Sequence, residues 1–219
     1  MTGFGAFGKI PSLGDFLRLN LPAGFVQAWD SWLQESMLQA KQILGDAWNE
    51  AYMSAPIWRF TLPAGIAGDG AVSGIVMSSV DRVGRQYPLT LAISHEGGAS
   101  ALTHFANRTV FEQLEDAALA ALEDDSTRDD LTAALQDISW IAPTRNQMSG
   151  NAYVGALPAA QSLAADAVHS AHGDAAIWSA MLEGNHRLLV TPSLPKGRDL
   201  MGLYDLSAPV WRQTSLVDV

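Results

Sequence analysis

Apolar residues recur every three or four positions in the first part of the chain, which is the period of a helix with one buried face. Within residues 24–44 the members of this repeat are Phe25, Trp29, Trp32 or Leu33, Met37, Ala40 and Leu44. Such a stripe predicts an amphipathic helix that ends at Gly45. A short second helix, from Asp46 to Met53 with Asp46 as its cap, is predicted to follow.

An alternating pattern, with a period of two, indicates strands elsewhere. Residues 57–62 read Ile-Trp-Arg-Phe-Thr-Leu, which predicts a strand with Ile57, Arg59 and Thr61 on one face. Four further apolar runs predict two hairpins, formed by residues 72–80 with 88–94 and by residues 176–182 with 186–191. Neighbouring runs joined by a short polar turn pair most readily as antiparallel strands.

The middle of the chain is rich in Ala, Leu and Glu and predicts two more helices. They span residues 100–123 and residues 128–138, the second with Thr127 as a cap. The glycines and prolines of residues 3–22 predict an entry segment of strand and turns. Residues 141–175, which are rich in Ala, Gly, Ser and Pro, follow no clear period.

Helices and strands that mix without strict alternation favour an α+β (mixed α/β) fold. We expect a single domain, residues 1–219, in which a central, mostly antiparallel sheet is flanked by helices, with residues 209–219 as a tail. The helix 24–44 should pack on this sheet through its Trp and Leu stripe. The core is expected to hold Leu33 and Phe60 together with Trp29 or Trp32.

The composition narrows the function. The chain has a net charge of −10, 48% hydrophobic and 16% charged residues, and no cysteine. Such an acidic chain repels phosphate backbones and anionic membrane surfaces, so we expect no nucleic acid as a partner. No apolar run reaches the roughly 18 residues that are needed to span a bilayer, so we expect no direct membrane insertion. The absence of cysteine excludes disulfides and thiolate chemistry. The start of the chain does not resemble a signal peptide, and the protein is expected to be cytoplasmic.

The glycines near the start fit two phosphate-binding patterns. The segment Gly3–Gly8 matches the glycines of a dinucleotide fold, and together with Lys9 it also matches Gly-x4-Gly-Lys. Both motifs need a preceding strand and a following helix, but two residues are too few for a strand and Pro11 disfavours a helical Ile10. We interpret the segment as a glycine-punctuated edge strand. A small nucleotide-binding protein or enzyme that uses it remains the alternative function.

Other combinations of reactive residues are weaker. Asp166, His169 and His172 could share a helix face and hold a metal ion, but no second ligand cluster accompanies them, and we interpret them as a solvated face. There is no Gly-x-Ser-x-Gly nucleophile elbow, and none of the histidines lies in a recognisable triad context. We therefore expect no cofactor, no metal and no enzymatic activity.

Charge gathers at one connection in an otherwise charge-poor stretch. The charged residues between positions 60 and 94 are Asp69, Asp81, Arg82 and Arg85. Gly84 supplies the freedom to reverse the chain there, and Arg59 of the neighbouring strand is expected to point to the same place. Two interpretations stay open: Asp81 pairs with one of the three arginines and anchors the turn, or the arginines contact an acidic or phosphorylated partner.

Several segments in the same order resemble the TagF (ImpM) family of proteins associated with bacterial type VI secretion systems. The resemblance is strong over residues 4–93 and weaker to about residue 208. The segments that carry it early in the chain are Phe7–Leu17, Leu21–Pro22, Phe25–Leu33, Ser54–Phe60, Gly74–Arg85 and Tyr87–Leu91. The segments that carry it late in the chain are Ile177–Ser179 and Gly202–Tyr204.

This resemblance implies a regulator that represses type VI secretion after translation. It also implies that the regulator binds a forkhead-associated scaffold protein of the same apparatus. It supplies no catalytic residues to carry over. The cluster of Arg59, Asp81, Arg82 and Arg85 is therefore the candidate site, either for a partner or for anchoring the turn.

Overall fold

A computed structural model describes residues 3–143, 147–149, 152–155, 157–182 and 184–212. Its strands are β1 (Gly5–Gly8), β2 (Leu17–Leu19), β3 (Trp58–Leu62), β4 (Ala71–Met77), β5 (Leu89–His95), β6 (Gln147–Ser149), β7 (Ala152–Val154), β8 (Ala176–Leu182) and β9 (Asn185–Thr191). Its α-helices are α1 (Ala23–Leu44), α2 (Trp48–Ser54), α3 (Ser100–Ala106), α4 (Arg108–Ala120), α5 (Arg128–Gln136), α6 (Ala159–His172) and α7 (Gly197–Tyr204). Two 3₁₀ helices, η1 (Gly45–Ala47) and η2 (Pro209–Trp211), complete the list.

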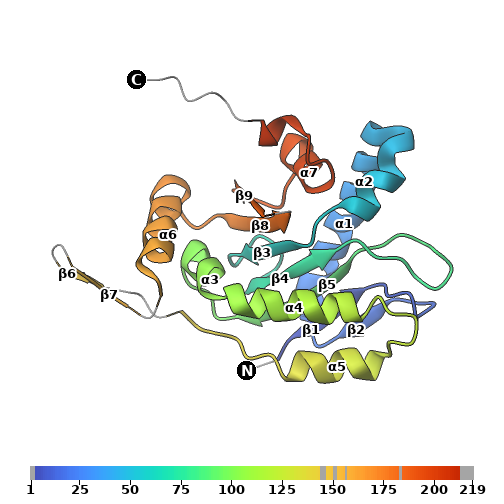
Figure 1. The fold of residues 1–219 in the computed structure, drawn as a ribbon, viewed down its shortest axis with the longest axis horizontal. Coiled ribbons are helices and arrows are strands. Elements are labelled where there is room, and N and C mark those ends of the chain that lie inside the picture. Colours follow the sequence, from blue (N-terminus) through green and yellow to red (C-terminus); the bar gives the residue numbers. More distant parts are fainter. Residues whose placement is uncertain (1–2, 144–146, 150–151, 156, 183, 213–219) are drawn as a thin grey trace.

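Seven strands form one antiparallel sheet in the order β2-β1-β5-β4-β3-β8-β9 (Figure 1). Both predicted hairpins are confirmed, because β4 pairs with β5 and β8 pairs with β9. The C-terminal hairpin joins the rest through β8, which pairs with β3. Strands from both ends of the chain thus complete one sheet, and the fold is the predicted α+β domain.

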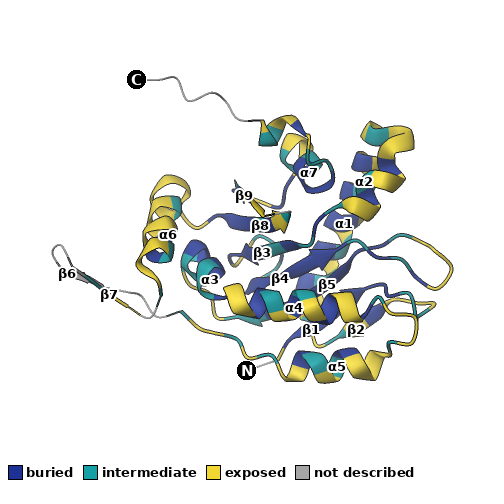
Figure 2. Cartoon of the chain, viewed as in Figure 1, coloured by how far each residue is buried: buried dark blue, intermediate teal, exposed yellow. Residues whose placement is uncertain are grey.

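Helices cover both faces of the sheet. Helices α1, α2 and α7 pack with one core, while α4 and α5 pack with the other core and α3 and α6 with a small third cluster. Figure 2 shows the strands largely buried and the outward faces of the helices exposed. None of the described helices is long and apolar enough to cross a membrane.

The predicted tryptophan stripe of α1 is confirmed as the centre of the first core. Trp29, Leu33 and Phe60 are fully buried or nearly so, and Trp32 is 7% exposed. The Trp29 ring lies 4.7 Å from the Phe60 ring and 6.0 Å from the Trp178 ring, centroid to centroid. Its indole N–H donates to the Thr90 hydroxyl at 2.9 Å, so a buried polar atom is satisfied inside an aromatic cluster.

The predicted helix 100–123 is wrong as a single element, because it breaks at Asn107. The Asn107 amide donates to the backbone oxygens of Thr103 and Ile141 and accepts from the Ile141 N–H. Asparagine side chains compete with the helix backbone in this way. The result is a corner between α3 and α4 that is tied to the segment after α5.

Three smaller predictions also need correction. β1 is not an edge strand, because it lies between β2 and β5. Its glycines permit close contact, since a Cβ on Gly5 would come within 2.3 Å of the Leu19 oxygen.

The predicted cap at Asp46 is wrong, because Asp46 lies in η1 and makes no side-chain cap, whereas the predicted Thr127 cap is present. Residues 209–211, predicted as the start of a tail, instead form η2, which packs on α7 through a hydrogen bond from the Trp211 indole to the Gly202 oxygen. Residues 213–219 lie outside the described residues.

Candidate functional site

The connection between β4 and β5 is built around a buried aspartate. The Asp81 carboxylate accepts four hydrogen bonds, from the Lys9 ammonium at 2.9 Å, the Arg85 Nε at 2.6 Å, and the backbone N–H groups of Val83 and Arg85 at 3.1 and 2.9 Å. Its side chain is fully buried. Gly84 takes a positive φ of 80°, which closes the turn. The first interpretation of the charged cluster is therefore correct for Asp81, with Arg85 as its arginine partner.

Lys9 is the partner that the sequence did not predict. It lies 72 positions before Asp81, directly after β1. Its ammonium group also lies 5.2 Å from the centre of the Phe16 ring. The lysine that fits a phosphate-loop pattern is thus buried and paired with a carboxylate, and β1 is followed by a strand instead of a helix.

Further hydrogen bonds join the β4–β5 connection to the loop between β1 and β2. Arg85 donates from Nη2 to the Gly14 oxygen at 2.9 Å, and the Arg82 N–H donates to the Leu13 oxygen at 3.1 Å. Both loops lie at the right-hand end of the sheet in Figure 1. Together with the Lys9–Asp81 pair, these bonds join the two loops into a single hydrogen-bonded unit.

The same connection is anchored to the helical layer on the other side. The Tyr87 hydroxyl donates to Asp30 of α1, and the Gln86 side chain bonds both Trp48 and Asn49 of α2. Burial, followed by the bond to Asp30 and its negative charge, raises the pKa of Tyr87 well above its usual range. The backbone of this loop is therefore held from both sides.

Six exposed side chains lie on this unit and on the adjoining start of β2, and we call them the two-loop surface: Asp15, Phe16, Arg18, Arg82, Val83 and Arg85. Val83 is 70% exposed and Phe16 is 36% exposed. The Arg82 side chain has no hydrogen-bond partner among the residues that the structure describes. Exposed apolar groups beside an arginine that is free to bind, on a hydrogen-bonded loop backbone, are typical of protein-binding surfaces.

Arg59 lies apart from the charged cluster at the β4–β5 connection, so the prediction that it points there was wrong. It lies on the face of β3 that meets α4, where its Nε and Nη2 donate to both carboxylate oxygens of Glu115 at 2.6 and 2.7 Å. The alternation of β3 correctly predicted that Arg59 and Thr61 share a face. The fork of an arginine favours such a bidentate partner, and Glu115 could not be identified from sequence spacing.

The remaining candidate residues are dispersed. Asp166, His169 and His172 are exposed on α6, which agrees with a solvated face. Among the described residues no group of histidine and carboxylate side chains is arranged to hold a metal ion.

The fold and its two-loop surface define an α+β protein in which two hydrogen-bonded loops present exposed basic and apolar side chains. The family described as "TagF N-terminal domain, Type VI secretion system-associated" matches residues 5–138. The chain belongs to this family, which has a role associated with type VI secretion. A crystal structure of PA0076 from Pseudomonas aeruginosa PAO1 is 32% identical to the chain, with a TM-score of 0.74, over 92% of this chain and 93% of that one. No curated protein matches the sequence.

Proposed function

We propose that the protein is a non-catalytic regulator that represses a type VI secretion system after translation. In this proposal it acts in the cytoplasm by binding a forkhead-associated scaffold protein of the apparatus. Membership of the TagF family supports the link to type VI secretion. The two-loop surface is the proposed contact with the scaffold.

The observation that carries this proposal is the division of roles within the charged cluster. Asp81 and Lys9 are buried and hold the loops, whereas Arg82 and Val83 next to them are exposed and make no side-chain hydrogen bonds within the described part of the chain. A backbone that is fixed before binding loses less conformational entropy when a partner docks. On a chain with a net charge of −10, such arginines favour an acidic patch of the partner.

The alternative, nucleotide binding through the glycine-rich start, finds less support. The Lys9 ammonium would have to leave Asp81 to contact a phosphate. A Cβ at position 8 would lie 2.0 Å from the Pro88 oxygen. Gly8 is therefore required for the close packing of β1 against the start of β5. We therefore favour partner binding as the function of this region.

Reversing one exposed charge should separate binding from folding. Arg82→Glu is expected to leave the melting temperature nearly unchanged, because the side chain contacts solvent, and to weaken scaffold binding by about tenfold or more through charge repulsion. The measurement is isothermal titration of the purified scaffold protein into each variant. Arg212→Glu is the matched control, because Arg212 is also exposed and lies outside the two-loop surface.

Arg85→Glu is a poorer test, because it would place a second carboxylate beside Asp81 and disturb the fold. A folded Arg82→Glu protein that binds the scaffold as tightly as the Arg212→Glu control would contradict the proposed surface.

A further inference from the structure

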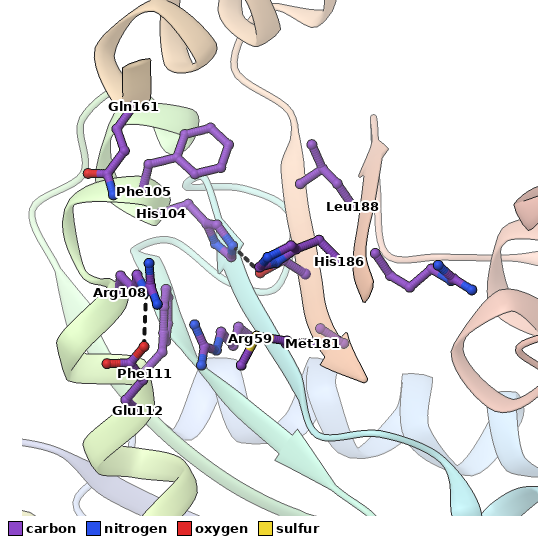
Figure 3. A pocket seen from close by; sticks show the side chains of 13 residues that line it. Arg59, His104, Phe105, Arg108, Phe111, Glu112, Gln161, Met181, His186 and Leu188 are labelled. Atoms are coloured by element: carbon purple, nitrogen blue, oxygen red, sulfur yellow. Dashed lines mark hydrogen bonds and ion pairs between the residues drawn. The ribbon is translucent and has the colours of Figure 1, made fainter. Parts of the chain in front are cut away.

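A pocket of about 280 Å³ lies between the α3–α4 corner and the β8–β9 hairpin (Figure 3). Figure 3 shows Arg108 and Glu112 of α4 on one side and His186 and Leu188 of the hairpin on the other, with Arg59 and Met181 between them and Gln161 of α6 above. His104 and Ser179 also line it. The pocket shares no residue with the two-loop surface. It needs the C-terminal hairpin, which lies beyond the matched residues 5–138.

A chain of hydrogen bonds, which is buried at its centre and partly buried at both ends, crosses the sheet and ends in this pocket. The Nε2 of His95 lies 3.0 Å from the Ser73 hydroxyl, which donates to the Thr61 hydroxyl at 3.1 Å. The Thr61 hydroxyl lies 3.0 Å from Nδ1 of His104, and Nε2 of His104 lies 2.7 Å from the Ser179 hydroxyl. Five side chains from four neighbouring strands and α3 are thereby connected.

One backbone group determines which atoms donate and which accept along the hydrogen-bond chain. The Gly97 N–H donates to Nδ1 of His95 at 3.2 Å, so this nitrogen must be the acceptor of its ring. Burial lowers the pKa of His95 to about 4, and burial followed by the charge of Arg59 lowers that of His104 to about 3. Both rings are therefore neutral near pH 7, and each carries a single N–H.

The proton positions can then be assigned from one end to the other. With Nδ1 of His95 accepting, its Nε2 donates to Ser73, Ser73 donates to Thr61, and Thr61 donates to Nδ1 of His104. His104 must then donate from Nε2 to the Ser179 oxygen. The Ser179 O–H is the one proton that no member of the hydrogen-bond chain accepts. It is available to bind a group in the pocket.

This direction excludes a serine–histidine nucleophile. A general base must accept the serine proton, but His104 presents its own N–H to Ser179, and its low pKa opposes a second proton. The His104–Ser179 pair can therefore donate a hydrogen bond to a bound group through the Ser179 hydroxyl.

Other donors face the same space. Arg59 uses Nε and Nη2 for Glu115, which leaves Nη1 outside that pair. Arg108 uses Nε for Glu112 and is 63% exposed, which leaves both of its Nη groups available. The apolar part of the lining comes from Phe105, Phe111, Met181 and Leu188. Met181 and Leu188 are 52% and 43% exposed, so the pocket offers uncovered apolar area beside its donors.

We propose that this pocket binds a carboxylate on an apolar body, with Ser179 and the two arginines donating to the carboxylate and the hairpin side chains contacting the apolar part. Glu112 and Glu115 neutralise the charge of the two arginines, which favours a single negative charge over the two of a phosphate. The group can be a free acid or the end of a peptide chain, because both present the same atoms.

Nitrogen NMR of the histidine side chains tests the assigned chain without any ligand. His95 and His104 should both appear as neutral rings protonated at Nε2, from pH 7 down to about pH 5. A His104 ring protonated at Nδ1 would reverse the chain and overturn the proposal.

Titration of labelled protein with 3-phenylpropionate tests the ligand class, and the tripeptide Gly-Gly-Phe with a free carboxyl end is the peptide arm. Saturable amide shifts near Ser179, Leu188 and Arg108 are expected for at least one probe, and the arm that binds identifies the source. Ser179→Ala should weaken binding about tenfold, as expected for one hydrogen bond to a charged group, and Ser170→Ala on the exposed face of α6 should not. Equal binding of the uncharged 3-phenylpropan-1-ol, or no saturable shift at this pocket with either probe, would overturn the proposal.

Discussion

Replacing Asp81 with alanine is expected to lower the melting temperature by about 10 °C, because it leaves a buried ammonium group without a partner. The Lys9 side chain is 9% exposed and its salt bridge is to Asp81. The same change removes the acceptor for two backbone N–H groups of the β4–β5 turn. Scanning calorimetry of the purified variant measures the shift.

Two controls separate the buried pair from the exposed part of the loop. Arg82→Ala should leave the melting temperature nearly unchanged. The double variant Lys9→Met, Asp81→Ala should recover part of the loss, because it removes the unpaired charge as well. If Asp81→Ala and Arg82→Ala were equally stable, Asp81 would not hold the loops.

The loss of melting temperature caused by Asp81→Ala should also depend on pH. Burial alone would raise the pKa of Asp81, but the hydrogen bonds from Lys9, Arg85 and Val83 outweigh it and hold the pKa well below its usual range. Because the folded pKa lies below the unfolded value of about 3.9, the stabilisation is complete above that pH and declines as pH falls further. The gap in melting temperature between wild type and Asp81→Ala should therefore narrow below about pH 4.

Trp29→Ala is expected to cost about 3–5 kcal/mol of unfolding free energy, since it opens a cavity in the aromatic cluster of the first core. Trp29 is fully buried and contacts the rings of Phe25, Trp32 and Phe60. The substitution also leaves the Thr90 hydroxyl without its indole donor. Denaturant unfolding followed by circular dichroism measures the change.

Leu38→Ala on the same helix is the matched control, because Leu38 is 60% exposed and should cost less than about 0.5 kcal/mol. Comparable unfolding free energies for the two variants would contradict the assignment of the buried face of α1.

Local periodicity explains why much of the fold could be predicted. The stripe of α1 and the two hairpins depend on residues that are close in sequence, and their patterns survive in the structure. The break at Asn107 could not be predicted, because its cause is a hydrogen bond to Ile141, 34 positions away. The pairing of β3 with β8 is also non-local and follows from the closure of the whole sheet.

The same distinction applies to the candidate sites. The pairing of Asp81 with Arg85 spans a single turn and was among the predicted alternatives. Lys9 and Glu115 are distant partners that only the packed sheet brings to Asp81 and Arg59. The hydrogen-bond chain to Ser179 gave no sequence signal, because serine, threonine and histidine on alternate strand positions are also typical of solvated faces.

We propose above all that the two-loop surface docks the forkhead-associated scaffold protein. Hydrogen–deuterium exchange of the protein, alone and saturated with the scaffold, tests it most directly. We expect the scaffold to slow amide exchange in both loops and at the adjoining start of β2, over residues 14–18 and 82–85. Slower exchange confined to other regions, with these loops unchanged in a saturated complex, would contradict it.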